Sequence, residues 1–146
     1  MTTSTTIHGT AKRTATTGTA VRFVKATEGE RVRVLDTDVV VKASAVDTEG
    51  RYEVVVGSSP EGAEIAPSRH PWEELYFILD GAMEIRIGGE QRLATAGDFV
   101  VVPAHAEHSF TVVTEFVRFL DISMGPGTAS AAAASAATSA GCRPLL

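Results

Sequence analysis

Short segments rich in Val, Ile and Phe recur through the middle of the chain, and residues that favour turns separate them. The segments follow one another at intervals of about 8–12 residues, which is typical of an antiparallel sandwich or barrel. No stretch between them has the length and 3.6-residue periodicity of a core helix. The pattern therefore predicts an all-β fold. The expected strands are residues 21–25, 31–35, 39–43, 52–56, 75–79, 83–87, 99–102, 109–113 and 116–122.

Turn chemistry marks the ends of these strands. Asp80-Gly81 and Gly88-Gly89 are dipeptides that tolerate the backbone of tight turns, and Gly97 lies in a similar break. Residues 58–62, Ser-Ser-Pro-Glu-Gly, are expected to form a turn for the same reason.

The 146 residues correspond to one domain with two unusual ends. Residues 1–20 are rich in Thr and are interpreted as a mobile arm, or as a segment that a partner subunit orders. Residues 125–146 are dominated by Ala and Ser and lack an amphipathic stripe, so they are interpreted as a tail. Residues 21–124 remain as the barrel.

Charge and cysteine content narrow the function classes. The formal net charge is −5, with 13 basic and 18 acidic residues interspersed, which argues against nucleic-acid and membrane-surface binding. The one cysteine, Cys142, excludes an intramolecular disulfide and fits a reducing compartment. No apolar run reaches the ~18 residues of a membrane span, and the first residues lack the apolar region of a secretory signal. The cytoplasm is the predicted location.

Polar residues whose side chains can bind a metal ion or a small molecule lie near the ends of the central strands. In an extended segment, residues two apart face the same side, so Ser68 and His70 share a face. The same alternation places Tyr76 and Ile78 with Glu74, and Phe110 and Val112 with His108. If these faces point inward, they describe a mostly apolar pocket with a few polar groups, which is the usual form of a ligand site.

A metal ion would explain the carboxylate in this set. Glu74 opens an otherwise apolar strand, and a buried carboxylate is costly unless it is paired or bound to a metal. Two imidazoles and one carboxylate suit divalent Zn, Fe, Mn, Co or Ni, and open coordination positions would allow iron–oxygen chemistry. The imidazoles and the carboxylate of this set are those of His70, His108 and Glu74.

Two motifs in order carry a family resemblance. Gly62-x5-Ser68-x-His70-x3-Glu74-x6-Gly81 resembles the first cupin motif, Gly-x5-His-x-His-x3–4-Glu-x6-Gly. Gly97-x5-Pro103-x-His105-x2-His108-x3-Val112 resembles the second, Gly-x5-Pro-x-Gly-x2-His-x3-Asn. The resemblance covers residues 21–123, and two motifs in register are a far stronger signal than one.

The resemblance implies a double-stranded β-helix, or jelly-roll barrel, around one divalent metal held by His70, Glu74 and His108. It also implies a homodimer, often with exchanged N-terminal strands. The sequence departs from the motifs at three positions, where Ser68 replaces a ligand histidine, His105 a glycine and Val112 an asparagine.

Roles follow for the residues around the expected ligands. Glu74, Tyr76 and His105 are the candidates for moving a proton, although a loop histidine such as His105 is more often simply exposed. Trp72 is expected to cap the pocket mouth or else to cover outer strands. The predicted pocket-lining residues are Ser68, Trp72, Ile78 and Phe110.

Three function classes remain open at this point. The first is a bacterial, metal-dependent enzyme of secondary metabolism that acts on a small, partly apolar carbonyl or aromatic compound. It would be a dioxygenase resembling quercetinases, or a cyclase or isomerase resembling cupin-type polyketide cyclases. The second is a metal-free or weakly metal-binding barrel that holds a small ligand, suggested by Ser68. The third is an interaction protein, which rests only on the Ala/Ser tail.

Overall fold

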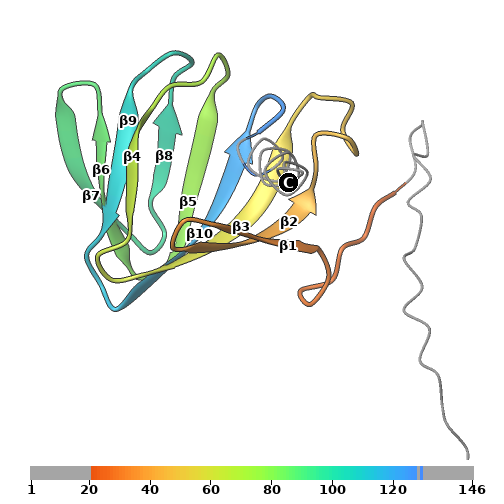
Figure 1. The fold of residues 1–146 in the computed structure, drawn as a ribbon, viewed down its shortest axis with the longest axis horizontal. Coiled ribbons are helices and arrows are strands. Elements are labelled where there is room, and N and C mark those ends of the chain that lie inside the picture. Colours follow the sequence, from red (N-terminus) through yellow and green to blue (C-terminus); the bar gives the residue numbers. More distant parts are fainter. Residues whose placement is uncertain (1–20, 128, 130–146) are drawn as a thin grey trace, which may run out of the picture.

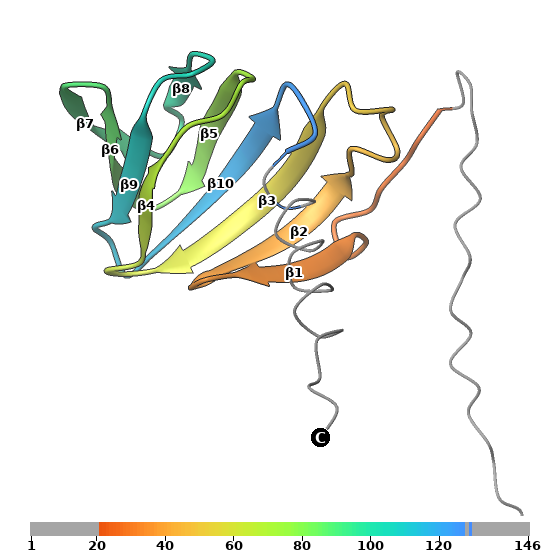
Figure 2. The same cartoon turned by 45° about the horizontal axis from the view of Figure 1, so that its top comes forward.

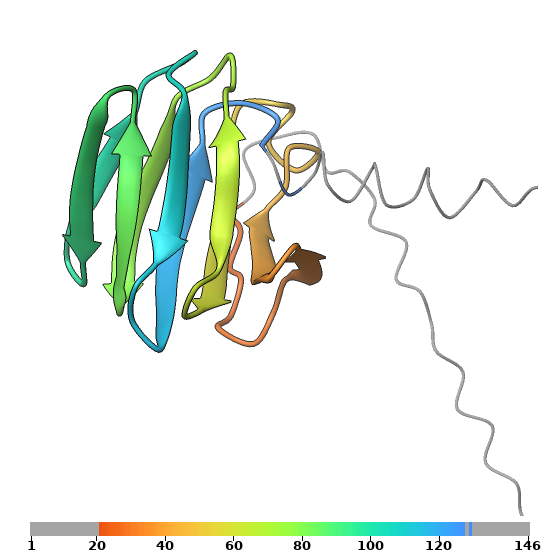
Figure 3. The same ribbon diagram turned by 60° about the vertical axis from the view of Figure 1, so that its left-hand side comes forward.

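The computed structural model describes residues 21–127 and 129, and the elements found there are ten antiparallel strands (Figure 1). One sheet has six strands in the order β1-β2-β3-β10-β5-β8, and the other has four in the order β4-β9-β6-β7. The two sheets face one another as layers (Figure 3). The bounds are β1 Glu30–Val34, β2 Thr37–Ala43, β3 Glu53–Pro60, β4 Glu64–Ser68, β5 Glu74–Asp80, β6 Ala82–Ile87, β7 Glu90–Thr95, β8 Phe99–Val102, β9 His108–Val112 and β10 Phe116–Ser123.

This arrangement confirms the predicted all-β, jelly-roll fold. Alternate residues of each strand point between the sheets, as the two-residue period of a strand requires. On β10, for example, Val117 and Phe119 are buried while Arg118 is exposed. The main core lies between the sheets and is formed by Ala63, Tyr76, Ile78, Met83, Ile85, Ala94, Val102, Phe110, Val112, Val117 and Phe119.

Strand register places polar residues in rows across the inner face of the six-stranded sheet. Ser123 on β10 lies opposite Glu53 on β3 and Glu74 on β5. One step along the strands, Asp121 lies opposite Val55 and Tyr76. The curved sheet carries these strands side by side (Figure 2), so three carboxylates distant in sequence share one end of the barrel interior.

Two rows of apolar residues cross much of the outer face of the same sheet. One row of directly paired residues runs Phe99, Phe77, Leu120, Val56, Val40 across five strands, and the next runs Val101, Leu75, Ile122, Val54. Phe99 is 58% exposed, and Phe77 and Val101 are also exposed. A sheet with one solvated face normally alternates apolar and polar residues, so this face departs from the expected pattern.

The strand predictions differ from the structure at four places. Residues 21–25 form no strand, and Val21 and Phe23 are almost fully exposed. Strands β4 and β7 were not predicted, because both are edge strands whose residues are mostly polar or, at Pro67, unable to donate a ladder hydrogen bond. Residues 58–60 continue β3 instead of turning, and Ser59 is buried with its hydroxyl 2.8 Å from that of Thr37.

The start of the predicted tail packs against the barrel. The N–H of Ala129 donates to Oε1 of buried Glu53 at 3.0 Å, and Ala129 contacts the small cluster of Val39, Val41 and Val55. A side chain at Gly127 would overlap Glu53, so this close approach requires a glycine. Residues 1–20 and 130–146, predicted as arm and tail, lie outside the described residues. No membrane-spanning helix is found in the part of the chain that the structure describes.

A glycine in β3 makes room for a core ring. Gly57 lies opposite Phe119 on β10, and a Cβ added at Gly57 would overlap that ring. Because Phe119 packs edge-on against both Tyr76 and Phe110, with centroids 5.9 and 5.8 Å away, the ring cannot move without disturbing the aromatic cluster.

The Gly57→Ala variant should therefore lose about 1–3 kcal/mol of unfolding free energy through overpacking. Gly89→Ala is the matched control, because a Cβ at Gly89 meets nothing within 4 Å and its φ is not left-handed. Urea denaturation of both variants measures the difference. Equal stability of the two variants would show that Phe119 does not constrain β3.

Candidate metal centre

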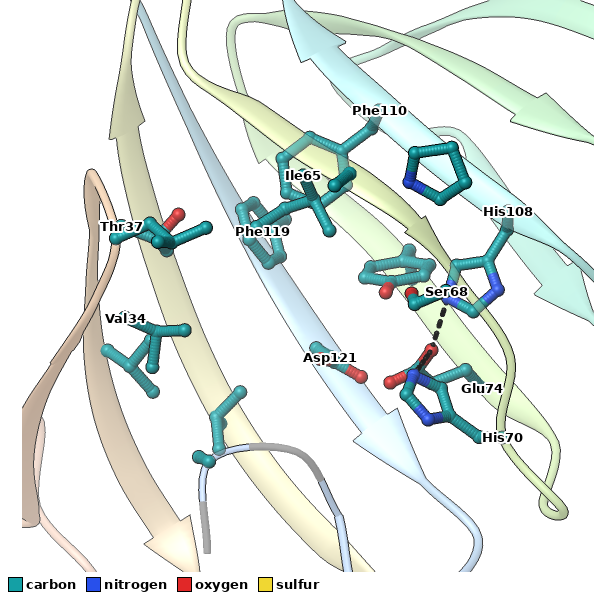
Figure 4. Close-up of a pocket in the computed structure, with 17 residues that line it drawn as sticks. Val34, Thr37, Ile65, Ser68, His70, Glu74, His108, Phe110, Phe119 and Asp121 are labelled. Carbon is teal, nitrogen blue, oxygen red and sulfur yellow. Dashed lines mark ion pairs between the residues drawn. The ribbon is translucent and has the colours of Figure 1, made fainter. Parts of the chain in front are cut away.

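His70, Glu74 and His108 meet at one end of the barrel interior, as predicted (Figure 4). Glu74 opens β5 and His108 opens β9, whereas His70 lies in the segment between β4 and β5. One ligand atom from each of the three side chains lies within 4.8 Å of the others. A single ion can therefore contact all three.

Glu74 is the most buried member of the set, with a relative exposure of 1%. Its Oε2 lies 2.9 Å from Nε2 of His108 and 3.7 Å from Nε2 of His70. The other oxygen, Oε1, accepts a hydrogen bond from the hydroxyl of Ser123 at 3.3 Å. Ser123 thus fixes one oxygen of the carboxylate and leaves the other directed at the imidazoles.

Backbone contacts orient the ring of His108. Its Nδ1 lies 3.1 Å from the carbonyl oxygen of Ala106, which selects the tautomer that donates from Nδ1 and leaves Nε2 as a lone pair. Burial alone lowers the pKa of His108, but the Glu74 carboxylate and the Ala106 carbonyl outweigh it and raise the pKa above its ordinary value. Nε2 thus binds either a proton or a metal ion beside Glu74.

His70 is held from two sides. The ring of Trp72 stacks on its imidazole at 5.0 Å with an interplanar angle of 5°, and the N–H of His105 donates to its carbonyl at 2.7 Å. Trp72 in turn lies against Gly125, where an added Cβ would come within 2.9 Å of the indole. The residues after β10 therefore support the ligand indirectly.

The donor set fits a divalent transition metal. Although Nε2 of His108 lies 2.9 Å away, Oε2 of Glu74 is a buried oxygen with no hydrogen-bond partner among the described residues. The two atoms are thus close but not aligned for a hydrogen bond. This is the geometry expected when the lone pairs of Nε2 and Oε2 both point at a common metal position. Two imidazoles and a carboxylate suit zinc, iron, manganese or nickel, and Ser68 in place of a third histidine leaves coordination positions open.

A pocket of about 360 Å³ opens from this site. Ser68 and Phe110 line it, as predicted, and Tyr76 lies in its wall. One end is polar and contains the three ligands, and the rest is lined mainly by apolar side chains of β1, β2, β3, β4, β9 and β10. The lining residues are Val34, Leu35, Thr37, Val39, Val55, Ile65, Ala66, Pro67, Ser68, His70, Glu74, Tyr76, His108, Phe110, Phe119, Asp121 and Ala129.

Asp121 is the main pocket residue that the sequence interpretation missed. Its side chain is 7% exposed, and its pKa is raised well above the ordinary value by burial and by the charges of Glu74 and Glu53. Across the strand pair, burial and the same acidic surroundings raise the pKa of the Tyr76 phenol. A signal did exist, because alternation along 116–123 puts Asp121 on the face of Val117 and Phe119.

Three other residues lie elsewhere than the sequence suggested. His105 is exposed and absent from the pocket lining. Ile78 points inward but fills the core, with no exposed surface. Trp72 stands behind His70 and does not line the cavity.

The backbone conformation of His105 explains why the second motif has glycine at this position. It has a φ of 66°, in the left-handed region, where the motif has glycine. This conformation is what directs its N–H toward the carbonyl of His70.

Comparison with known proteins decides the family. The family model described as a cupin domain matches residues 54–123, which hold both motifs and all three candidate ligands. Residues 54–123 are a cupin domain. This cupin is 27% identical over 96 residues to quercetin 2,3-dioxygenase of Bacillus subtilis (strain 168), a match that covers 65% of this chain. The matched region spans only 28% of that relative's length.

Solved cupin-like structures superpose well at low identity. KdgF from Halomonas sp. has a TM-score of 0.65 and 21% identity, covering 75% of this cupin and 96% of that chain. The polyketide cyclase RemF from Streptomyces resistomycificus has a TM-score of 0.62 and 20% identity, covering 71% of this cupin and 79% of that chain. At these identities the likeness concerns the fold.

His105→Gly should increase the unfolding free energy by about 0.5–1 kcal/mol, because glycine adopts the left-handed conformation without the steric cost that an L side chain pays. His105→Ala is the control that removes the imidazole and keeps the strain. Thermal and urea denaturation give the values. A less stable His105→Gly protein would mean that the imidazole itself stabilises the loop.

Proposed function

We propose that this cupin is a metal-dependent enzyme acting on a small, partly apolar carbonyl or aromatic compound, and that its reaction is that of a dioxygenase. The observation that carries the proposal is a set of three ligand side chains at one end of a largely apolar cavity. The similarity to a quercetin 2,3-dioxygenase supports the reaction class. When bound, iron would supply dioxygen activation, whereas zinc, manganese or nickel would polarise a carbonyl.

The chain's own residues would perform three tasks. His70, Glu74 and His108 would hold the ion, with Ser123 and the Ala106 carbonyl fixing the orientation of two of them. Phe110 and Phe119 would exclude water and seat an apolar ring. Tyr76, buried in the pocket wall beside Glu74, would hold a proton near the reacting end of the substrate.

A cyclase or isomerase is the second candidate. The buried phenol of Tyr76 and the carboxyl of Asp121 share the pocket, and two such groups suit proton transfer without oxygen. The fold likeness to the polyketide cyclase RemF is compatible with this chemistry.

The alternative outside enzymology is a small-ligand binder that holds no metal. Two observations favour it, namely the serine at position 68 and the 2.9 Å approach of Nε2 of His108 to Glu74, which a protonated imidazole also satisfies. The function that depended on the Ala/Ser tail rests on residues outside the described ones, and the cytoplasmic location also stays a prediction.

Metal uptake tests the proposal against this alternative. The chelator-treated protein should take up one equivalent of Fe, Zn, Mn or Ni, and gain about 2.7 kcal/mol of stability at a free-metal concentration 100 times Kd. His108→Ala should lose both effects because one of three ligands is gone. His105→Ala, which removes an exposed histidine three residues away, is the matched control and should retain both. Elemental analysis and thermal denaturation are the measurements.

The metal-free binder would be favoured if the unaltered protein took up no metal. It would also be favoured if His108→Ala took up as much metal as His105→Ala. If uptake is confirmed, oxygen consumption with quercetin as the trial substrate separates the dioxygenase from the cyclase. Turnover without oxygen consumption would favour the second candidate.

We also propose that two copies of the chain associate through the outer face of the six-stranded sheet. Apolar rows cross five and four neighbouring strands of this face, and contiguous exposed apolar patches mark association sites. The face lacks charges at the paired positions named above, so a twofold-related copy would meet the same apolar side chains.

Phe99→Lys should weaken this dimer by at least about tenfold, since it buries an unpaired charge in an apolar contact. Val46→Lys is the control, because Val46 is 77% exposed and lies in the loop before β3, away from both rows. Light scattering across a concentration series measures the dissociation constant. A monomeric unaltered protein, or an equal effect of both substitutions, would contradict the assignment.

A further inference from the structure

Asp121 presents a buried acceptor to the pocket that no described residue uses. Its Oδ1 has no hydrogen-bond partner among the described residues, although only 7% of the residue's surface is exposed. In Figure 4 the side chain extends from β10 into the cavity, between the ligand end and the apolar end. A buried polar atom left unpaired costs about 1–3 kcal/mol, so a molecule in the pocket that supplies a donor would recover that cost.

The surroundings of Asp121 determine which molecules are admitted. Glu74 and Glu53 both lie near enough to act on it electrostatically. No lysine or arginine stands among the described residues that line the pocket, although His70 and His108 lie at its ligand end. In the metal-free protein a substrate carboxylate or phosphate beside Asp121 would therefore lose its hydration next to buried acidic residues, with no lysine or arginine to pair with it, which is the costly arrangement for a desolvated charge.

The apolar walls of the pocket determine what kind of molecular framework can bind beside Asp121. Phe110 and Phe119 meet at 70° with centroids 5.8 Å apart, so their edges and faces offer a site for a further aromatic ring. Val39, Val55 and Ile65 continue the apolar surface beyond them. A flat, apolar body placed there would extend past Asp121 toward the ligand end.

We propose that Asp121 is a specificity-determining residue, and that the pocket takes uncharged aromatic molecules whose hydroxyl donates a hydrogen bond to it. This assignment rests on the proposed function only in naming the bound molecule a substrate. It predicts discrimination by the head group of the ligand: phenols bind, their ethers bind less well because they lack the donor, and aryl carboxylates are rejected.

Three probes with one biphenyl body test the proposal: 4-phenylphenol, 4-methoxybiphenyl and biphenyl-4-carboxylate. Binding is followed by calorimetry and by the fluorescence of Trp72, the one tryptophan of the chain. We expect the unaltered protein to bind the phenol at least about tenfold more tightly than the ether, with the carboxylate weakest. Each titration is run on chelator-treated protein, because a bound divalent ion would itself attract the carboxylate.

Two substitutions test the acceptor at position 121. Asp121→Asn keeps an acceptor oxygen, so it should retain the preference for the phenol over the ether. Asp121→Leu has no acceptor and should lose that preference. Asp38→Asn, which makes the same change at an exposed carboxylate outside the pocket, is the control and should leave the preference unchanged. If Asp121→Leu does not fold, Asp121→Ala takes its place.

Several results would overturn the assignment: equal affinity of the unaltered protein for the phenol and the ether, an unchanged preference for the phenol in Asp121→Leu, or binding of none of the probes. Failure of the proposed function is distinguishable, since it would appear as absent metal uptake while the chelator-treated protein still selects phenols. The reverse outcome, metal uptake with no selection, would overturn only the role of Asp121.

Discussion

The burial of the Glu74 carboxylate is the constraint on which the site depends. A carboxylate removed from water is stable only where cations or donors replace its hydration. Here a serine hydroxyl satisfies one oxygen, and two imidazoles stand beside the other. In this arrangement a proton on His108 and a divalent ion are alternative partners for the same carboxylate. Metal binding would release that proton, so affinity for the ion and the charge state of the imidazole are two aspects of one equilibrium.

The ligand set could be predicted from sequence because two motifs in register contain all three residues, and local periodicity indicated the faces of two of them. Glu74 and His108 each open a strand, and alternation fixes which neighbours share their faces. Alternation determines that a residue points inward, but it does not determine whether a cavity or a neighbouring side chain lies there. Ile78 illustrates the limit, since it is on the predicted face and is enclosed by the core. Asp121 shows the opposite error: its face was readable, but only the pairing of β10 with β5 brings it to Tyr76.

Other differences arise from strand pairing that leaves little trace in composition. Strands β4 and β7 lie at the edges of the smaller sheet, where one side needs no ladder partner and polar residues or proline are tolerated. Their segments therefore lack the β-branched runs that marked the central strands. Residues 21–25 have such a run, yet no described strand pairs with them. Composition indicates how readily a segment forms a strand. Whether the segment joins a sheet also depends on a neighbouring strand with an unpaired edge.

The pocket itself follows from the unequal width of the two sheets. Six strands face four, so the inner surfaces of β1, β2 and β3 continue beyond the part of the larger sheet that the smaller one covers. Val34, Val39 and Val55 lie on this extension and line the cavity, while Ala129 covers part of it through its hydrogen bond to Glu53. A barrel with matched sheets would fill this volume with core side chains. The extra strands thus supply the apolar walls, while Glu74 on β5 and Asp121 on β10 supply carboxyl groups to the pocket, within one continuous sheet.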